Sequence, residues 1–356
     1  MIQKLIKFIQ LADRVVPKKT TLPILSNVCV EDGFIRATDL ETTIRMPVED
    51  KRRYTLPYGI LKSVVKSKPK SFDIDLLINK KIKITYDNRK LLIQSLDPND
   101  FPSMLKESFK SIGSWSKKTL QSLGSMLPFA SKEEFKPALR GIYVNLSEDI
   151  TFAATDGHLL REARIVSSTP GGKVRFKGII PAAPLEVIAK YAISSTEVEY
   201  SKSFIKFTLP SEIEIFIKLI DEKYPPYEEF VNAKKRSSVE FSKKDMISVI
   251  TDAKEFSDKT TLRAELVASN GSIKIITADH ERDVHFESRV KAENRRGKCE
   301  KTGFNLKYLE KVLKSIKSEK IRWEFGKPIE ASYFRGLTRE DEGVTNLLMP
   351  IRLEDK

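Results

Sequence analysis

The chain repeats one pattern three times, and this repetition restricts the possible folds more than any other feature of the sequence. Leu61, Leu185 and Leu309 recur at equal intervals, each inside a short segment that follows an apolar residue. Every such segment carries apolar side chains three positions apart, which is typical of one face of a short helix entered from a strand. The three segments span residues 57–65, 181–189 and 305–313.

A second set of helical patterns precedes the first. Apolar residues at positions i, i+3 and i+7 predict amphipathic helices around residues 5–12, 120–127 and 246–253. The second of these helices should begin at Ser116 or Lys117 and the third at Ser242, because serine is a favourable N-cap.

Alternating apolar and polar residues fill the space between the helices and predict strands. Strands expected at 34–39, 150–156 and 273–279 each end in an aspartate. Further strands are expected at 72–78, 198–200 and 321–325, and the residues 86–89 read as a hairpin turn.

Each repeat therefore reads helix, strands, helix, strands in about 120 residues. Strands outnumber helices and local hairpins dominate, so the sequence predicts an α+β fold with antiparallel sheets and helices on one face. The predicted domains are 1–114, 115–234 and 235–356, with boundaries at a Gly- and Ser-containing stretch and at a basic run in 232–238.

The charge balance points to an anionic partner. The 356 residues include 63 Lys and Arg against 49 Asp and Glu, a net charge of +14. Such an excess favours a nucleic-acid partner, although a basic surface can also serve solubility alone.

Composition also narrows the compartment and the chemistry. Cys29 and Cys299 are too few for a disulfide framework and lack metal-ligand spacing, which favours a reducing cytoplasm. No apolar run approaches ~18 residues, and Lys4 and Lys7 interrupt the first stretch, so neither a membrane span nor a signal-peptide core is expected. We expect no metal and no cofactor.

Six short motifs, found in order from one end of the chain to the other, resemble those of the bacterial sliding clamp, the beta subunit of the replicative DNA polymerase III. They are TLPILSN at 21–27, ATDLE at 37–41, LRG at 139–141, ATDGH at 154–158, FNLKY at 304–308 and MPIRL at 349–353.

The resemblance implies both an assembly and a function. Three clamp-type domains per chain and two chains head to tail would form a closed ring, with helices lining the hole and sheets outside. The ring would encircle duplex DNA, slide on it, and tether the polymerase and other DNA-processing proteins. It would be non-catalytic, and an ATPase loader would open it.

Lysines of the predicted helices are the candidate DNA contacts, because a sliding protein must neutralise phosphates without reading bases. The alternative for each is a solvated helix face. By resemblance, Lys18 and Lys19 lie in a loop that reaches toward DNA. The full set is Lys4, Lys7, Lys18, Lys19, Lys62, Lys66, Lys117, Lys118, Lys190, Lys243, Lys244, Lys307, Lys311 and Lys314.

The resemblance further implies a hydrophobic pocket for partner peptides, including those of polymerase and clamp-loader subunits. The matching positions are Leu139, Thr155, Gly157, His158, Leu159, Leu160, Pro225, Phe230, Asn305, Tyr308, Ile329, Leu347, Met349, Pro350, Ile351 and Arg352. Leu, Met, Pro and Phe suit apolar anchors, while His158, Asn305 and Arg352 suit the peptide backbone. The alternative is that 347–353 is an ordinary core strand.

Ring closure by strand edges and a small apolar contact is also implied by the resemblance. Leu91 and Ile93 match one side of that contact and Phe256 matches the other. The alternative is that these side chains are buried within their own domain.

Two other classes of function compete with a clamp. Asp39, Glu41, Asp156, His158, Asp279 and His280 follow strands, as ligands of a metal-dependent nuclease do, but an aspartate that ends a strand more often caps a turn. A basic peptide-binding scaffold that forms no ring is the other alternative. The residues 170–173 superficially resemble a phosphate-binding loop, but Val174 replaces the required Ser or Thr, so they read as a turn.

Overall fold

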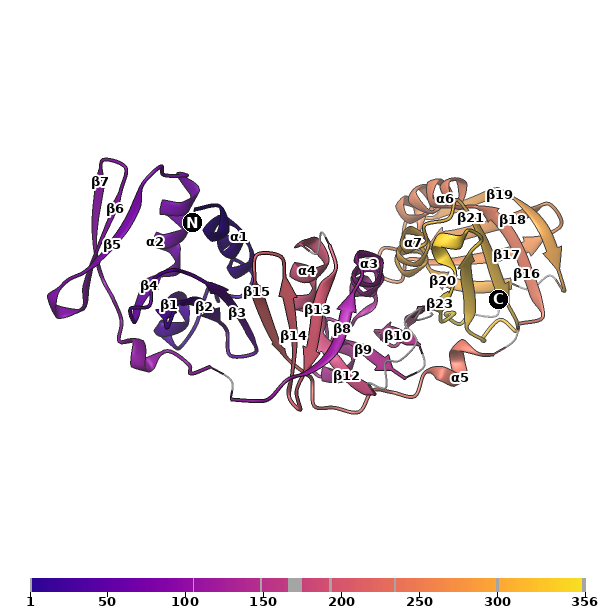
Figure 1. The fold of residues 1–356 in the computed structure, drawn as a ribbon. Coiled ribbons are helices and arrows are strands. Elements are labelled where there is room, and N and C mark those ends of the chain that lie inside the picture. The colour runs from indigo at the N-terminus through magenta and orange to yellow at the C-terminus, as the bar shows by residue number, and fades with distance from the viewer. Residues whose placement is uncertain are drawn as a thin grey trace. The chain divides into compact units, whose positions relative to one another are not determined.

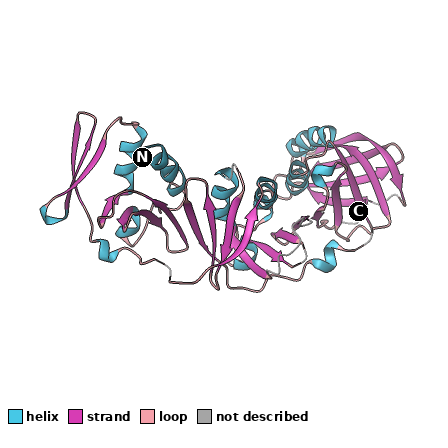
Figure 2. Cartoon of the chain, viewed as in Figure 1, coloured by secondary structure: helices cyan, strands magenta, loops and turns pink. Residues whose placement is uncertain are grey.

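The computed structural model describes residues 2–104, 106–147, 149–165, 175–191, 194–233, 235–298 and 301–353. Cys299 and the turn expected at 170–173 lie outside the described residues. Figures 1 and 2 show the helices and strands of the chain. The chain divides into two compact units, each built from two segments. Unit 1 comprises Met1–Gly124 and Ile180–Asp221, and unit 2 comprises Ser125–Ile179 and Glu222–Lys356. The three-domain boundaries expected from the repeats stay a prediction.

Unit 1 is built on an eight-stranded antiparallel sheet. In spatial order its strands are β4 (Tyr54–Pro57), β1 (Asn27–Glu31), β2 (Phe34–Thr38), β3 (Thr42–Pro47), β15 (Ile213–Lys218), β14 (Phe204–Leu209), β13 (Thr196–Tyr200) and β8 (Lys110–Trp115). A separate three-stranded sheet contains β5 (Phe72–Leu76), β6 (Lys81–Tyr86) and β7 (Arg89–Gln94). The expected hairpin turn is confirmed, because Tyr86 pairs with Arg89.

Four helices of unit 1 pack as two pairs. The pairs are α1 (Ile2–Ala12) with α2 (Tyr58–Lys66), and α3 (Lys117–Gly124) with α4 (Ala182–Tyr191). The helix expected around residues 120–127 ends earlier than predicted. α3 stops at Gly124, and Leu127 opens a short 3₁₀ turn that contains Pro128. A Cβ at Gly124 would lie 2.8 Å from the Cβ of Ala189, so the close approach of α3 and α4 needs glycine there.

Unit 2 is built on a twelve-stranded sheet, and the last two residues of its first strand, β12, belong to the segment of unit 1 that begins at Ile180. In order, its strands are β12 (Phe176–Pro181), β9 (Gly141–Leu146), β10 (Ile150–Thr155), β11 (Leu159–Ile165), β23 (Val344–Leu348), β22 (Ser332–Gly336), β21 (Lys320–Phe325), β16 (Ser237–Ser242), β19 (Val284–Arg296), β18 (Ser272–Asp279), β17 (Arg263–Ser269) and β20 (Lys301–Asn305). All recorded pairings are antiparallel, as predicted.

Two helices of unit 2 cover one face of its sheet. α6 (Lys243–Phe256) packs against β16, β18 and β19, and α7 (Leu306–Ser315) packs against β20, β23 and α6. Ser242 caps α6 by accepting a hydrogen bond from the backbone N–H of Asp245 at 3.3 Å, which confirms the expected start of that helix. A short helix, α5 (Glu228–Val231), precedes β16.

The core of unit 2 is aromatic. Trp323 lies 5.9 Å from Phe304 and 6.2 Å from Phe334, measured between ring centroids, and all three side chains are fully buried. Burying each such ring stabilises the fold by about 1.5–3 kcal/mol. No helix in the described part of the chain combines the length and apolarity needed to span a membrane.

Candidate functional site

The aspartate that ends one strand in each repeat caps the following turn. Asp39 accepts hydrogen bonds from the N–H groups of Glu41 at 3.0 Å and Thr42 at 2.6 Å. Asp156 does the same for residues 158 and 159, at 2.9 and 3.0 Å, and Asp279 for residues 281 and 282, both at 3.1 Å. This confirms the capping role. Within the described residues no three His, Cys, Asp or Glu side chains gather as a metal site.

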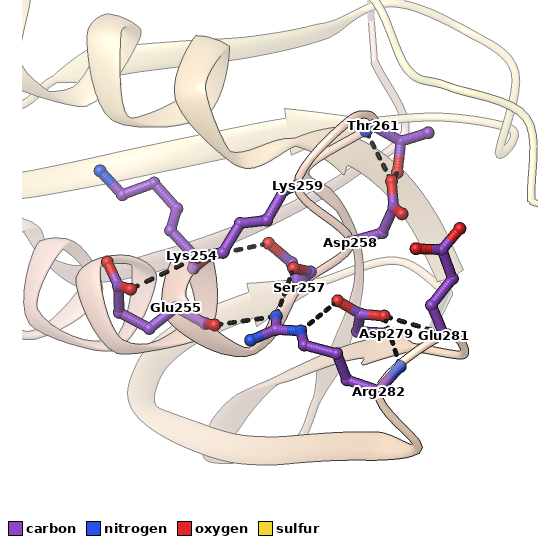
Figure 3. Close-up of polar contacts among 9 residues, drawn as sticks. All are labelled: Lys254, Glu255, Ser257, Asp258, Lys259, Thr261, Asp279, Glu281 and Arg282. Atoms are coloured by element: carbon purple, nitrogen blue, oxygen red, sulfur yellow. Dashed lines mark hydrogen bonds and ion pairs between the residues drawn. The ribbon is translucent and has the colours of Figure 1, made fainter.

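The third of these turns is tied to the end of α6 (Figure 3). The guanidinium of Arg282 donates to Asp279 Oδ2 at 2.6 Å and to the carbonyls of Glu255 and Ser257 at 3.1 and 3.2 Å. The Arg282 hydrogen bond holds the pKa of the Asp279 carboxyl below its usual value. Phe256, between the two carbonyls, is thereby held at the surface with 42% of its area exposed.

The candidate dimer residues lie at two strand edges. β7 pairs only with β6 among the described residues, so its other edge is open. On β7, Ile93 is buried and Leu91 is half-buried, whereas Leu92 between them is 57% exposed. Phe256 stacks on Phe286 of β19 at 5.3 Å.

Sequence reasoning missed Leu92 and Phe286 at these edges. Strand alternation carried the signal, since a buried Ile93 puts Leu92 on the opposite face. In β19, residues 284–291 pair with β18, while the pairing with β16 covers only residues within 292–296. The other edge of the 284–291 stretch is therefore also open among the described residues.

Several candidate peptide-binding residues come together in unit 2. The ring of His158, in the β10–β11 turn, stacks on Tyr308 of α7 at 5.4 Å. The N–H of Met349 donates to the His158 carbonyl at 2.8 Å, and the N–H of Ile351 donates to the Gly303 carbonyl at 2.9 Å. The chain after β23 thus runs beside the His158–Tyr308 pair, and Met349 remains 38% exposed.

Four other candidates for peptide binding are buried in the strands beside the cluster. Leu159, Leu160, Leu347 and Thr155 are buried, and β11 pairs with β23 so that Leu160 lies opposite Leu347. The half-buried candidates are Leu139, Asn305, Tyr308, Pro350 and Ile351, and the exposed ones are Gly157, His158, Pro225, Phe230, Ile329, Met349 and Arg352.

Asn305 has a structural task that the sequence did not reveal. Its Oδ1 accepts from the N–H groups of Lys307 and Tyr308 at 3.0 and 3.2 Å, so it caps α7. Its Nδ2 donates to the carbonyl of Thr261 at 2.7 Å. These bonds engage the amide that was expected to hold a peptide backbone.

Pro225, Phe230 and Ile329 stand apart from the cluster in the recorded contacts. Ile329 is 70% exposed and Phe230 56%. The Tyr333 hydroxyl donates to the carbonyl of Phe230, which ties α5 to β22. Among the described residues, no hydrogen bond or ring contact joins these three side chains to His158 or Tyr308.

A buried arginine lies where β11, β23 and α7 meet. The Arg161 guanidinium donates to Asn346 Oδ1 at 2.5 Å, Ser315 Oγ at 3.0 Å and Ser125 Oγ at 3.2 Å. Burial lowers the pKa of Arg161 to about 10, so it stays charged at neutral pH. Nearby, Lys311 lies 3.8 Å from Asp156, and burial lowers the pKa of this lysine.

Twelve of the fourteen candidate DNA-facing lysines fall into two groups. The first is exposed and forms no ion pair among the described residues, and it comprises Lys4, Lys7, Lys18, Lys19, Lys66, Lys117, Lys118, Lys244 and Lys307. In the second, Lys62 pairs with Asp13, Lys314 with Glu310 at 2.7 Å and Lys311 with Asp156. Lys190 is exposed near the end of α4.

Lys243 differs most from expectation. Its ammonium donates to the carbonyls of Ile316 and Lys317 at 3.0 and 3.1 Å and pairs with Glu319 at 3.2 Å. It therefore ties the start of α6 to the segment after α7. The stripe expected at 307, 311 and 314 retains one unpaired ammonium, that of Lys307, among the described residues.

Known proteins resemble this chain along its whole length. Residues 232–352 match the family model of the DNA polymerase III beta subunit, C-terminal domain. A beta sliding clamp from Pseudomonas aeruginosa is 25% identical, covering 99% of this chain and 98% of its own. One from Rickettsia bellii is 26% identical, covering 90% of each chain.

Solved structures share the fold. The DNA polymerase sliding clamp from Bacillus subtilis superposes with a TM-score of 0.89 at 19% identity, covering 99% of this chain and 98% of that one. The DNA polymerase III subunit beta from Pseudomonas aeruginosa superposes with a TM-score of 0.88 at 24% identity, with the same coverage.

Proposed function

The chain belongs to the DNA polymerase III beta subunit family, the beta sliding clamps, and from this premise we propose that it encircles duplex DNA as a ring of two chains. One observation on this chain itself supports the proposal. The helix pairs α1–α2, α3–α4 and α6–α7 each carry exposed lysines that form no ion pair among the described residues. Free ammonium groups neutralise phosphates without reading bases, as sliding requires.

Ring closure is proposed to join the open edge of β7 in one chain to the open edge of β19 in the other. The apolar contact would pair Leu92, with Leu91 and Ile93 behind it, against Phe256 stacked on Phe286. Open edges and exposed apolar side chains favour association with another chain. The family implies the head-to-tail arrangement.

Light scattering after size exclusion, at low micromolar protein, tests ring closure. We expect a mass about twice the 40.6 kDa of one chain, and a single-chain mass for Phe256→Asp. Phe135→Asp, at a side chain that is 79% exposed elsewhere, is the matched control and should leave the dimer intact. A single-chain mass for the unmodified protein would favour the peptide-binding scaffold without a ring.

We further propose that the His158–Tyr308 cluster and Met349 receive short hydrophobic peptides of the polymerase, the clamp loader and other DNA-processing proteins. Met349 can adapt to different apolar anchors, and the stacked rings offer a flat apolar wall beside it. Arg352 is exposed and suits the peptide backbone or a carboxylate.

Fluorescence polarisation with a labelled peptide of two or three apolar anchors tests this site. Met349→Asp should weaken binding at least about tenfold, because it places a charge among apolar anchors. Leu96→Asp changes a side chain of similar exposure, 39%, in unit 1 and should bind normally. Equal losses in both variants would contradict the assignment.

The proposal includes a non-catalytic role in the cytoplasm, where an ATP-dependent loader opens the ring around DNA. The capping task of Asp39, Asp156 and Asp279 supports it, because these carboxylates serve turns rather than gather round a metal.

A further inference from the structure

A strongly basic cavity in unit 2 has no part in the function proposed so far. Its volume is about 1000 Å³, at the upper end of the range for ligand pockets. Two carboxylates, Glu240 and Glu324, line it together with six cationic side chains. These six are Lys235, Arg236, Arg295, Arg296, Arg322 and Arg335.

The basic cavity lies on the sheet face opposite α6 and α7, beside the end of the short helix α5. Glu240 pairs with Arg322, and Arg322 with Arg335, so these three side chains share one face of neighbouring strands. Val239 and Trp323, which alternate with them, are completely buried on the face that α6 covers. The basic cavity is therefore separate from the lysines of α6 and α7.

Three of the cations are neutralised by carboxylates. Arg322 donates to Glu240 Oε1 through Nε at 3.0 Å and through a terminal nitrogen at 2.6 Å. Arg335 pairs with Glu324 at 3.3 Å, and Lys235 pairs with Glu330 at 3.4 Å.

The other three cations keep their charge uncompensated. Arg236 and Arg296 are exposed and form no ion pair among the described residues. Among the described residues, Arg295 bonds to two uncharged groups, the Asn270 side chain at 2.5 Å and the Gly297 carbonyl at 3.0 Å. Its Nε is buried and has no hydrogen-bond partner within that part of the chain.

The backbone forces these arginines together from distant parts of the chain. β16 pairs with β19 so that Ser238 lies opposite Arg296. The N–H of Lys298 donates to Ser237 Oγ at 3.2 Å. Gly297 has a φ of +78°, and a Cβ there would lie 2.4 Å from the same Oγ. Like charges that line one cavity repel one another, and a bound anion would relieve the repulsion.

We infer that the basic cavity binds the phosphate backbone of a single nucleic-acid strand, outside the channel of the ring. Guanidinium groups match phosphate oxygens in a two-pronged geometry, and five of the six cations are arginines. Among the described residues the apolar lining consists of Val231 and Ala233, two small side chains that give an acidic protein little to anchor on.

A flexible strand suits this concave cavity better than a stiff duplex, because a chain that bends can follow its lining. None of the described residues that line the cavity is aromatic, so bases have no ring to stack on there, and the expected contacts go to phosphates regardless of sequence. The inference goes beyond the proposed function and does not need a closed ring.

Fluorescence anisotropy of a labelled single-stranded DNA 20-mer, titrated with the full chain at several salt concentrations, tests the inference. Arg236→Glu with Arg296→Glu should weaken binding and lower the slope of log affinity against log salt by roughly 1.4, since each phosphate contact to a single strand contributes about 0.7. Arg236→Lys with Arg296→Lys keeps the charge and should retain most of the slope.

The matched control is Lys202→Glu with Lys223→Glu, two exposed lysines outside the basic cavity, the helix pairs and the proposed ring-closure edges. This control changes the net charge equally and should leave the slope near that of the unmodified protein. Unmodified melting temperatures would show that all variants fold.

Three results of the DNA titrations would overturn the inference. They are an unchanged slope in the Arg236–Arg296 charge reversal, an equal fall in the lysine control, and a loss confined to duplex DNA. Displacement of the strand by a poly-glutamate peptide as readily as by unlabelled DNA would also overturn it. The helix lysines are tested separately on duplex DNA, so failure here leaves the sliding-clamp proposal standing.

Discussion

Replacing Arg161 by methionine should destabilise unit 2 more than any surface change. The variant keeps an apolar side chain of similar length but removes three hydrogen bonds, at 2.5, 3.0 and 3.2 Å. Asn346 Oδ1 would then keep only a long contact of 3.4 Å with Ser315 Oγ.

The magnitude follows from two opposing effects. Hydrogen bonds to a charged donor contribute about 1.5–3 kcal/mol each, and an abandoned buried acceptor costs about 1–3 kcal/mol. Relief of the buried charge offsets part of this loss. We expect the free energy of unfolding to fall by about 3 kcal/mol, which lowers the melting temperature of a unit of this size by roughly 6–12 °C.

Differential scanning calorimetry measures the effect. Arg161→Lys retains the charge but not the two-pronged set of donors, so its melting temperature should lie between those of Arg161→Met and the unmodified protein. Arg339→Met changes an exposed arginine and should stay within about 0.5 kcal/mol of the unmodified protein. If Arg161→Met melts at the unmodified temperature, the network contributes nothing and the reasoning fails.

Three further predictions concern the turns and the helix lysines. Asp156→Ala should lower the free energy of unfolding by about 1 kcal/mol and weaken peptide binding. Asp156→Asn keeps the capping oxygen and should do neither. Calorimetry would measure the stability and fluorescence polarisation the peptide binding. The pKa of Asp279 lies below its usual value, so its ion pair with Arg282 stabilises the fold at neutral pH and is lost as pH falls below about 4. The melting temperature of Asp279→Asn should therefore depend less on pH in the acid range. An unchanged dependence would refute this. Lys244→Glu with Lys307→Glu should lower the slope of log affinity for duplex DNA against log salt by roughly 1.8, at about 0.9 per phosphate, in an anisotropy titration. An unchanged slope would count against the helix lysines as DNA contacts.

The sequence predicted the repeated helices and strands well because each has its own periodicity. The helices at 57–65, 181–189 and 305–313 formed within one or two residues of expectation. The end of α3 at Gly124 was missed, although Pro128 in the next turn is a local signal for it. The close packing of Gly124 against Ala189 could not be foreseen, because it depends on a residue far along the chain.

The candidate sites were harder to predict because charge and exposure depend on distant partners. Lys243 looked like a free lysine, yet its ammonium is held by carbonyls some 70 residues away. The basic cavity was visible only as the basic run at 232–238, because its other half is brought there by the β16–β19 pairing.

Topological linkage to DNA is the most direct test of the account. The protein would be loaded onto nicked circular plasmid by an ATP-dependent clamp loader, separated from free protein at moderate salt, and the plasmid then cut once. A sliding ring should stay on the circle, leave after the cut, and remain if the cut ends are blocked by bound protein. Equal retention on circular and cut plasmid would show that the chain binds DNA without encircling it, which contradicts the central claim.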